Sequence, residues 1–177
     1  RESVVVEQHG RGAVALRILA ACCALFTAML GVVVILGWHT GNALLIQVHE
    51  SYVPMQYNTA LGFALLGLGL FFVLLGNRRL ILLSSAVLML VGILTLFQYI
   101  FDISLGIDQL LMEHYIRVET SHPGRMAPIT ALCFSISGTA LFLGALIRGK
   151  HAAGRTIGVM TSFVVALAFV AFVGYLS

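Results

Sequence analysis

The sequence predicts an all-α integral membrane protein with five transmembrane helices, four of them arranged as two parallel repeats of a helical hairpin. Composition is the first indication, because 60% of the 177 residues are hydrophobic and only 10% are charged. A soluble domain cannot bury so many apolar side chains. Apolar stretches of about 20 residues, the length that crosses a bilayer, are the second indication. An internal repeat is the third.

The predicted spans contain no Asp, Glu, Lys, Arg or His, as expected of helices that face lipid. They cover approximately residues 18–38, 57–76, 80–101, 127–147 and 156–177. The first ends in Gly37-Trp38-His39 instead of a small-residue cleavage site, so we expect it to be retained and not removed as a signal peptide. The chain begins without Met and stops at Ser177, where the fifth span ends. We therefore expect it to be a fragment of a longer protein.

Basic residues set the expected orientation, because short loops rich in Lys and Arg stay in the cytoplasm. Eight of the ten precede the first span or lie in the turns after the second and fourth. The opposite side carries five acidic residues against Arg117 and Arg125. We therefore expect a multi-pass protein of the bacterial inner (plasma) membrane with a cytoplasmic N-terminus. The expected partner is the lipid bilayer with its anionic headgroups, and not nucleic acid.

Residues 55–71 and 126–142 are two copies of one segment, identical at eight of seventeen aligned positions. Both keep the pattern Met-x-x-x-Thr-Ala-Leu-x-Phe. We expect repeats over about 42–101 and 104–177, each with an outer loop, an inward helix, a cytoplasmic turn and an outward helix. Both copies run in the same direction, whereas many secondary transporters use inverted copies.

Each outer loop contains apolar residues at helical spacing, which predicts a short amphipathic helix on the membrane surface. These residues are Leu44, Leu45, Val48 and Tyr52 in the first loop, and Ile107, Leu110, Leu111 and Tyr115 in the second, where Ser104 is the expected cap.

Polar residues near the outer helix ends predict either a hydrogen-bonded clamp between helices or a pocket for a small, partly apolar ligand. An unpaired amide in hydrocarbon costs on the order of several kcal/mol, so each Asn or Gln there needs a partner. The candidate ligand-binding residues are Tyr52, Tyr57, Asn58, Thr59, Gln98, Tyr99 and Thr130.

Four histidines in the outer loops, close to acidic residues, provide a candidate zinc or copper site. They are His39, His49, His114 and His122. Their spacing matches no familiar metal motif, and no histidine lies at the membrane depth that a pair of haems requires, so the cofactor remains unknown. The residues form no catalytic constellation, and we do not expect this chain to be an enzyme by itself.

Three segments, PMQYNTALGF (54–63), GIDQLL (106–111) and PGRMAPITALCF (123–134), resemble the repeated multi-helix amino-terminal input region of many bacterial sensor histidine kinases and some diguanylate cyclases. The resemblance covers about residues 55–177. The Asn that usually precedes the Thr in that family is Asn58 in the first copy and Ile129 in the second. The resemblance implies a sensory membrane module, a kinase or cyclase domain outside this chain, and a third copy of the motif after Ser177.

We therefore expect the input module of a bacterial signal-transduction protein, in the first place a homodimeric sensor histidine kinase of a two-component system. It would detect a periplasmic or membrane stimulus through a small-molecule ligand or a change in packing. One alternative is a transporter or channel subunit, although the ionisable intramembrane residues typical of that class are missing. The other is a haem- or metal-binding membrane redox protein.

Overall fold

The computed structural model describes residues 2–47, 53–116, 122–147 and 159–168, with side chains from Gly12 onward. This described part consists of helices and the loops between them, without a strand. The all-helical class is confirmed, and four of the described helices are long and apolar enough to cross a membrane, as a membrane protein requires. Of the predicted fifth span, only the apolar helix Val159–Ala168 lies among the described residues.

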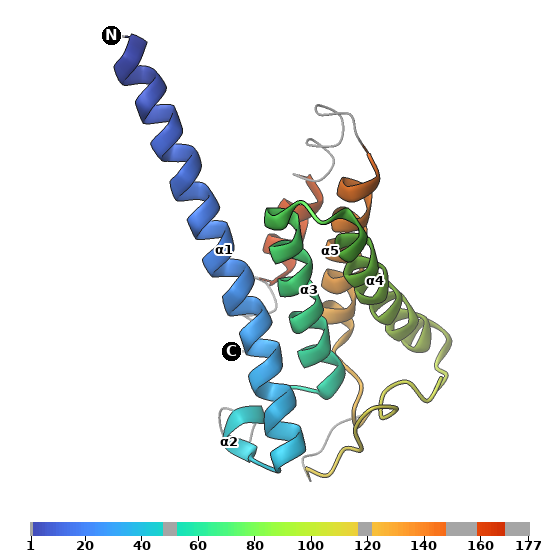
Figure 1. Ribbon diagram of the computed structural model, residues 1–177. Coiled ribbons are helices and arrows are strands. Elements are labelled where there is room, and N and C mark those ends of the chain that lie inside the picture. The colour runs from blue at the N-terminus through green and yellow to red at the C-terminus, as the bar shows by residue number, and fades with distance from the viewer. Residues whose placement is uncertain (1, 48–52, 117–121, 148–158, 169–177) are drawn as a thin grey trace.

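The helices lie close to the predicted positions. In chain order they are α1 (Glu2–Thr40), α2 (Ala43–Ile46), α3 (Tyr57–Leu75), α4 (Arg78–Phe101) and α5 (Pro128–Leu146). The ends of α3, α4 and α5 fall within two residues of the predicted ones. α1 is longer than predicted, with 39 residues, and leads away from the other helices toward the N-terminus (Figure 1). At 1.5 Å per residue it is about twice as long as the hydrocarbon core is thick.

The four long helices alternate in direction, so that α1 and α4 end where α3 and α5 begin (Figure 1). We call this end of the bundle the loop end. At the opposite end, Gly76 closes α3 with a φ of 68°, and the Asn77 side chain caps α4 by accepting the Leu80 N–H at 3.3 Å. Gly and Asn are the residues favoured at these two positions, and the turn predicted after the second span is observed.

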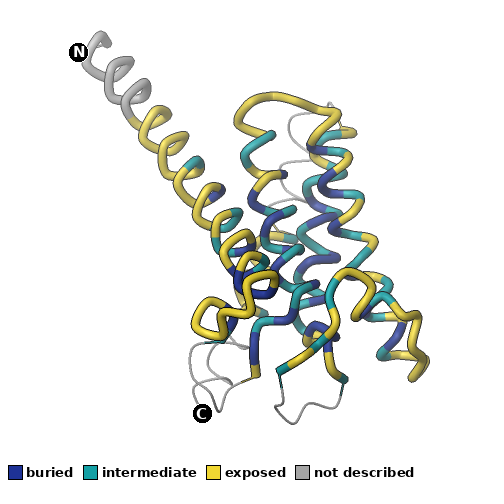
Figure 2. The backbone as a smooth tube through the Cα atoms, turned by 60° about the horizontal axis from the view of Figure 1, so that its bottom comes forward, coloured by how far each residue is buried: buried dark blue, intermediate teal, exposed yellow. Residues whose placement is uncertain are grey.

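The inner faces of the helices are buried, whereas their outer faces are exposed and apolar (Figure 2). Phe26 of α1 is 71% exposed, and Leu83 of α4 is 63% exposed. Soluble monomers rarely expose so much contiguous apolar surface, but a helix in a bilayer covers it with lipid tails. The exposed faces are therefore consistent with membrane-spanning helices.

Close contacts recur in the two helix pairs α1–α3 and α4–α5, which we call the first and second halves. A Cβ atom on Gly31 would collide with the backbone of Ala64, and one on Gly92 would lie 2.8 Å from the Ser135 backbone nitrogen. Only glycine permits such an approach between helices. The two glycines are 61 residues apart, and their partners are 71 residues apart.

Further contacts of the two halves are related by the same offsets, 61 residues between α1 and α4 and 71 residues between their partners. Gly67 meets the backbone of Ala28 in the first half, as Gly138 meets the backbone of Met89 in the second. At the loop end, Trp38 Nε1 donates to the Met55 carbonyl at 2.9 Å, and the Tyr99 hydroxyl donates to the Met126 carbonyl at 3.1 Å. α3 and α5 each have 19 residues, and they begin and end 71 residues apart. The halves thus share helix positions and contacts, and the loop of the second is ten residues longer.

The prediction of an amphipathic helix in the second outer loop is wrong, because residues 102–116 contain no helix that Ser104 could cap. The carbonyls of Ile107 and Asp108 accept hydrogen bonds from the Asn58 side chain at 3.0 and 3.3 Å. Gly106 adopts a φ of 71°, outside the helical region. Hydrogen bonding to α3 therefore overrides the local apolar spacing.

The first outer loop forms only the single turn α2. Asn42 caps it by accepting the Leu44 N–H at 3.1 Å, and the turn ends at Ile46. The remainder of the predicted amphipathic segment, with Val48 and Tyr52, lies outside the described residues.

Candidate functional site

Asp108 gathers polar side chains from three parts of the loop end. Its Oδ1 accepts a hydrogen bond from Gln98 Nε2 of α4 at 2.9 Å, and its Oδ2 forms a 2.8 Å ion pair with Arg125 Nε, just before α5. Asn58 of α3 holds the same stretch of backbone through the carbonyls of Ile107 and Asp108. A single loop residue thus connects α3, α4 and the segment that leads into α5.

The ion pair is buried but well supplied with further hydrogen bonds. Gln98 is fully buried, and its Oε1 accepts the Leu105 N–H at 2.7 Å. Arg125, which is 7% exposed, donates from Nη2 to the Ile103 carbonyl at 3.2 Å and lies 5.2 Å from the Tyr99 ring centre. Buried pairs are tolerated when such additional bonds satisfy the remaining polar atoms. The network formed by Asn58, Gln98, Asp108 and Arg125 is thus a hydrogen-bonded clamp.

Residues 103–116, which we call the strap, also reach α1. The Tyr115 hydroxyl donates to the Trp38 carbonyl at 3.1 Å, and the two rings meet edge to face with centres 5.0 Å apart. Burial raises the pKa of Tyr115, so the hydroxyl keeps its proton near neutral pH and remains a donor. The strap therefore contacts α1, α3, α4 and the segment before α5.

A cavity of about 620 Å³ lies beside this network, and we call it the loop-end cavity. It is lined by Val53, Pro54, Met55, Gln56, Thr59, Tyr99, His122, Arg125, Ala127, Pro128 and Thr130. Three pairs of lining residues are repeat equivalents 71 positions apart, namely Pro54 and Arg125, Gln56 and Ala127, and Thr59 and Thr130. The cavity therefore lies between matching positions of the two halves.

Thr59 and Thr130 bring two free hydroxyls to the cavity, since neither side chain makes a hydrogen bond to a described residue. Several other Ser and Thr hydroxyls in the described helices donate to the carbonyl four residues earlier, among them those of Thr27, Ser84, Thr95, Ser135 and Thr139. For Thr59 and Thr130 this carbonyl belongs to Met55 and Met126, which accept the bonds from Trp38 and Tyr99 instead. Both threonines lie in the first helical turn, so their hydroxyls remain available to a ligand.

Gln56 is a third polar group of the cavity wall. It is 6% exposed, and its Oε1 accepts no hydrogen bond from a described residue. It occupies the N-cap position of α3 without capping the helix, and Ala127 does the same at α5. An unpaired buried amide costs on the order of 1–3 kcal/mol, so the Gln56 Oε1 is an acceptor that a donor in the cavity, such as water or a ligand group, would satisfy.

The structure divides the predicted ligand-binding residues into four groups. Thr59, Tyr99 and Thr130 line the loop-end cavity, and Asn58 and Gln98 belong to the adjoining clamp. Tyr57 lies to one side, where its hydroxyl is 3.3 Å from His39 Nε2, and Tyr52 is outside the described residues.

The predicted metal-binding histidines are dispersed. His114 packs against Trp38 with both ring nitrogens buried, His122 meets the Tyr99 ring and His39 pairs with Tyr57, whereas His49 is outside the described residues. Within the part of the chain that the structure describes, no three His, Cys, Asp or Glu side chains are grouped so as to hold a metal ion.

Sequence reasoning missed Asp108, Arg125 and Gln56, which it treated as ordinary loop or helix-flanking residues. The amides of Asn58 and Gln98 need hydrogen-bond partners, and this need was a usable signal. The partners of Asn58, however, are the carbonyls of Ile107 and Asp108, which are distant from it in sequence. Gly124 adds a second constraint, because its φ of 81° and close approach to the Asp108 carbonyl exclude a side chain there. Such contacts become visible only when the loop path is known.

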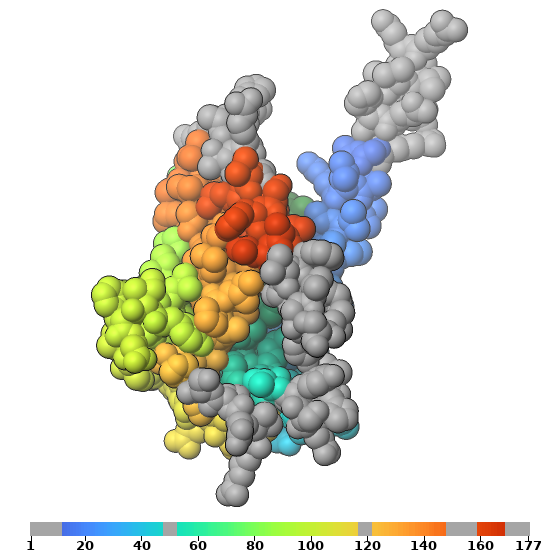
Figure 3. All heavy atoms as spheres, turned by 180° about the vertical axis from the view of Figure 1, so that it is seen from behind, coloured from blue at the N-terminus to red at the C-terminus, as the bar shows by residue number. Residues whose placement is uncertain are grey.

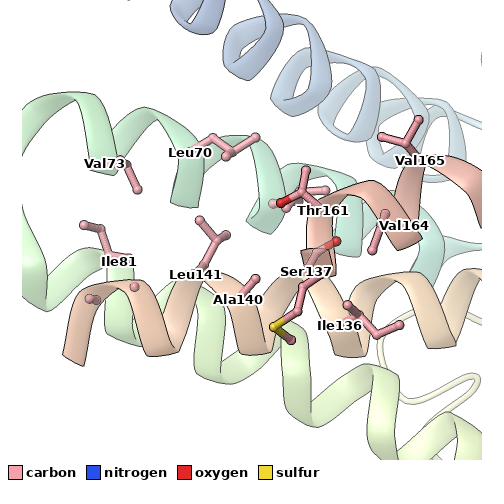
Figure 4. A pocket seen from close by; sticks show the side chains of 14 residues that line it. Leu70, Val73, Ile81, Ile136, Ser137, Ala140, Leu141, Thr161, Val164 and Val165 are labelled. Carbon is pink, nitrogen blue, oxygen red and sulfur yellow. The ribbon is translucent and has the colours of Figure 1, made fainter. Parts of the chain in front are cut away.

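A second cavity, of about 570 Å³, lies between α3, α4, α5 and the helix 159–168. Figure 3 shows this last helix against α5 on the back of the bundle. Figure 4 shows side chains such as Leu70, Ile81 and Val164 around the cavity. Among the described residues that line it, only Ser137 and Thr161 carry hydroxyls, so this lining suits hydrocarbon and offers little for recognising a polar ligand.

Comparison with known proteins identifies no relative, since no family model, no curated protein and no solved structure matches the chain.

Proposed function

We propose that this chain is the sensory input module of a bacterial signal-transduction protein, in the first place a sensor histidine kinase, and that the loop-end cavity is its receptor site. The observation that carries the proposal is the position of the cavity between matching residues of the two halves. A ligand that contacts Thr59 and Thr130 together would respond to the spacing between α3 and α5. Concave sites with a few convergent polar groups are typical of ligand recognition.

The fold offers a route from this cavity to the other end of the bundle. The strap ties the cavity wall to α1 and α4 through Trp38 and Gln98, and a two-residue turn joins α3 to α4. Ligand binding shifts such an assembly only if one arrangement of the helices binds the ligand more tightly, and each tenfold preference supplies about 1.4 kcal/mol. α1, which continues beyond the apolar span, would carry the change to the cytoplasm.

The proposal includes the finer topology. We propose five spans, built from parallel repeats, with the N-terminus in the cytoplasm and the loop end facing the periplasm of an inner membrane. The distribution of basic residues supports this orientation. A homodimer and a small-molecule stimulus follow from the family resemblance and from the cavity, respectively.

The test uses the complete reading frame that contains this chain, expressed in its native membrane. We expect it to encode a cytoplasmic kinase or cyclase domain whose output varies with growth conditions. Thr130→Trp should fill the cavity and fix the output at one level, whereas the control Leu83→Trp, on the lipid-facing side of α4, should respond like the wild type. A reading frame without an output domain, or a Thr130→Trp protein that still responds normally, would refute the proposal.

A further inference from the structure

We infer that the loop-end cavity binds an oxyanion, a carboxylate or phosphate, that carries a neighbouring hydroxyl or amine group. This inference rests on the proposed receptor function and names the class of its ligand. It follows from three features of the cavity wall: a buried cation, two uncapped helix starts and an unpaired amide.

The cation is Arg125. Its bonds to Asp108 and to the Ile103 carbonyl use Nε and Nη2, and Nη1 makes no hydrogen bond to a described residue. Asp108 does not line the cavity, whereas Arg125 does. The other titratable groups of the described wall are His122 and Tyr99, so no carboxylate lines it directly. Arginine with free N–H groups in a cavity wall is well suited to carboxylate and phosphate.

The helix starts add to this preference. α3 and α5 begin at the cavity, each without a side-chain cap and without an acidic residue in its first turn. The first N–H groups of a helix and the positive end of its dipole attract anions. The Thr59 and Thr130 hydroxyls in these turns supply further donors from both halves. All these groups favour a negatively charged ligand.

Gln56 indicates, independently of the cation and the helix starts, that the ligand carries a hydrogen-bond donor. This side chain is 6% exposed, lines the cavity and has an unpaired Oε1. A bare anion has no donor for that oxygen, whereas a hydroxy acid or amino acid has one. A volume of about 620 Å³ falls within the usual 300–1,000 Å³ of small-molecule sites and leaves room for a small organic acid with water. An anionic lipid headgroup with hydroxyls, such as phosphatidylglycerol, satisfies the same groups.

The binding experiment uses the purified chain in nanodiscs and follows the fluorescence of Trp38, the one tryptophan of the sequence, which is bonded to the cavity residue Met55. Nanodiscs of phosphatidylcholine alone are titrated with lactate, malate, serine and glutamate, and with acetate as the acid that lacks a donor. A second series replaces part of the lipid by phosphatidylglycerol. Saturable binding of a hydroxy or amino acid, with acetate at least tenfold weaker, would identify a soluble ligand. A signal that saturates with phosphatidylglycerol content would identify the headgroup.

The double substitution Thr59→Val and Thr130→Val keeps the side-chain shape, leaves the clamp intact and should weaken binding at least tenfold, because hydrogen bonds to charged groups contribute about 1.5–3 kcal/mol each. Gln56→Met should abolish the preference over acetate. The matched control Thr27→Val, distant from the cavity, should bind like the wild type. Absence of saturable binding in both lipid series, or equal binding by the double variant, would overturn the oxyanion inference. If Thr130→Trp still fixes the cellular output, the receptor function stands with a ligand of another class.

Discussion

Asp108→Asn tests whether the clamp holds the loop end together. The substitution keeps the size of the side chain and leaves one oxygen to accept from Gln98, but it removes the charge that Arg125 faces at 2.8 Å. Removing one partner of a buried pair costs about 3–5 kcal/mol, because the other charge stays buried without compensation. Since Arg125 also borders a cavity that water can enter, we expect the lower end, about 3 kcal/mol of unfolding free energy.

The assay is reversible unfolding in mixed micelles with increasing dodecyl sulfate, followed by circular dichroism and by Trp38 fluorescence. Hydrogen exchange in the strap should accelerate in the same variant, because its main anchor is weakened. Asp102→Asn is the matched control: Asp102 is exposed, and its φ of 51° suits Asn equally well. This control should change the free energy by less than about 0.5 kcal/mol.

A double-mutant cycle separates the charge effect from general damage to the loop. Arg125→Met alone should also destabilise the protein, but Asp108→Asn combined with Arg125→Met should cost less than the sum, with a coupling free energy of about 2 kcal/mol. An Asp108→Asn variant as mild as Asp102→Asn, or simple additivity of the two clamp substitutions, would show that the charge pair does not hold the loop end together.

Three further substitutions test the packing, the repeated hydrogen bond and the orientation. Gly92→Val should destabilise the protein by about 3 kcal/mol in the same unfolding assay because its side chain would meet the α5 backbone, whereas Gly12→Val, with nothing within 4 Å, should be neutral. Tyr99→Phe should cost about 1–2 kcal/mol of unfolding free energy, because it leaves the buried Met126 carbonyl unpaired. A neutral result would show that this hydrogen bond does not stabilise the fold. A cysteine at Ser104 should react with an impermeant maleimide in cells whose outer membrane is permeabilised, and a cysteine at Asn77 only after the inner membrane is opened; the reverse pattern would contradict the proposed topology.

Helix positions were predictable because hydrocarbon imposes a length and a polarity that are visible in the sequence. α3 and α5 illustrate this, since apolar composition located both and the repeated Met-x-x-x-Thr-Ala motif marks both starts. The turn at Gly76 and Asn77 was predictable for a different reason, because each residue has a local conformational or capping preference.

The loop end was less predictable because its structure depends on contacts distant in sequence. Apolar spacing over residues 107–115 indicated a surface helix, but the Asn58 side chain binds that backbone and the strap follows an irregular path. The equivalence of α1 and α4 was also hidden. Trp38 and Tyr99 play the same part with different donor groups, so residue identity does not relate them.

Differences between the halves would let the loop-end cavity bind the proposed ligand in one direction. Thr59 and Thr130 are identical equivalents, so a ligand meets the same hydroxyl on either side. Pro54 corresponds to Arg125 and Asn58 to Ile129, so the second half provides the charge while the first provides the amide that holds the strap. The longer second loop makes this division possible, because it brings Asp108 between Asn58 and Arg125. An anionic group should therefore point toward the second half, and its neighbouring donor toward Gln56 of the first.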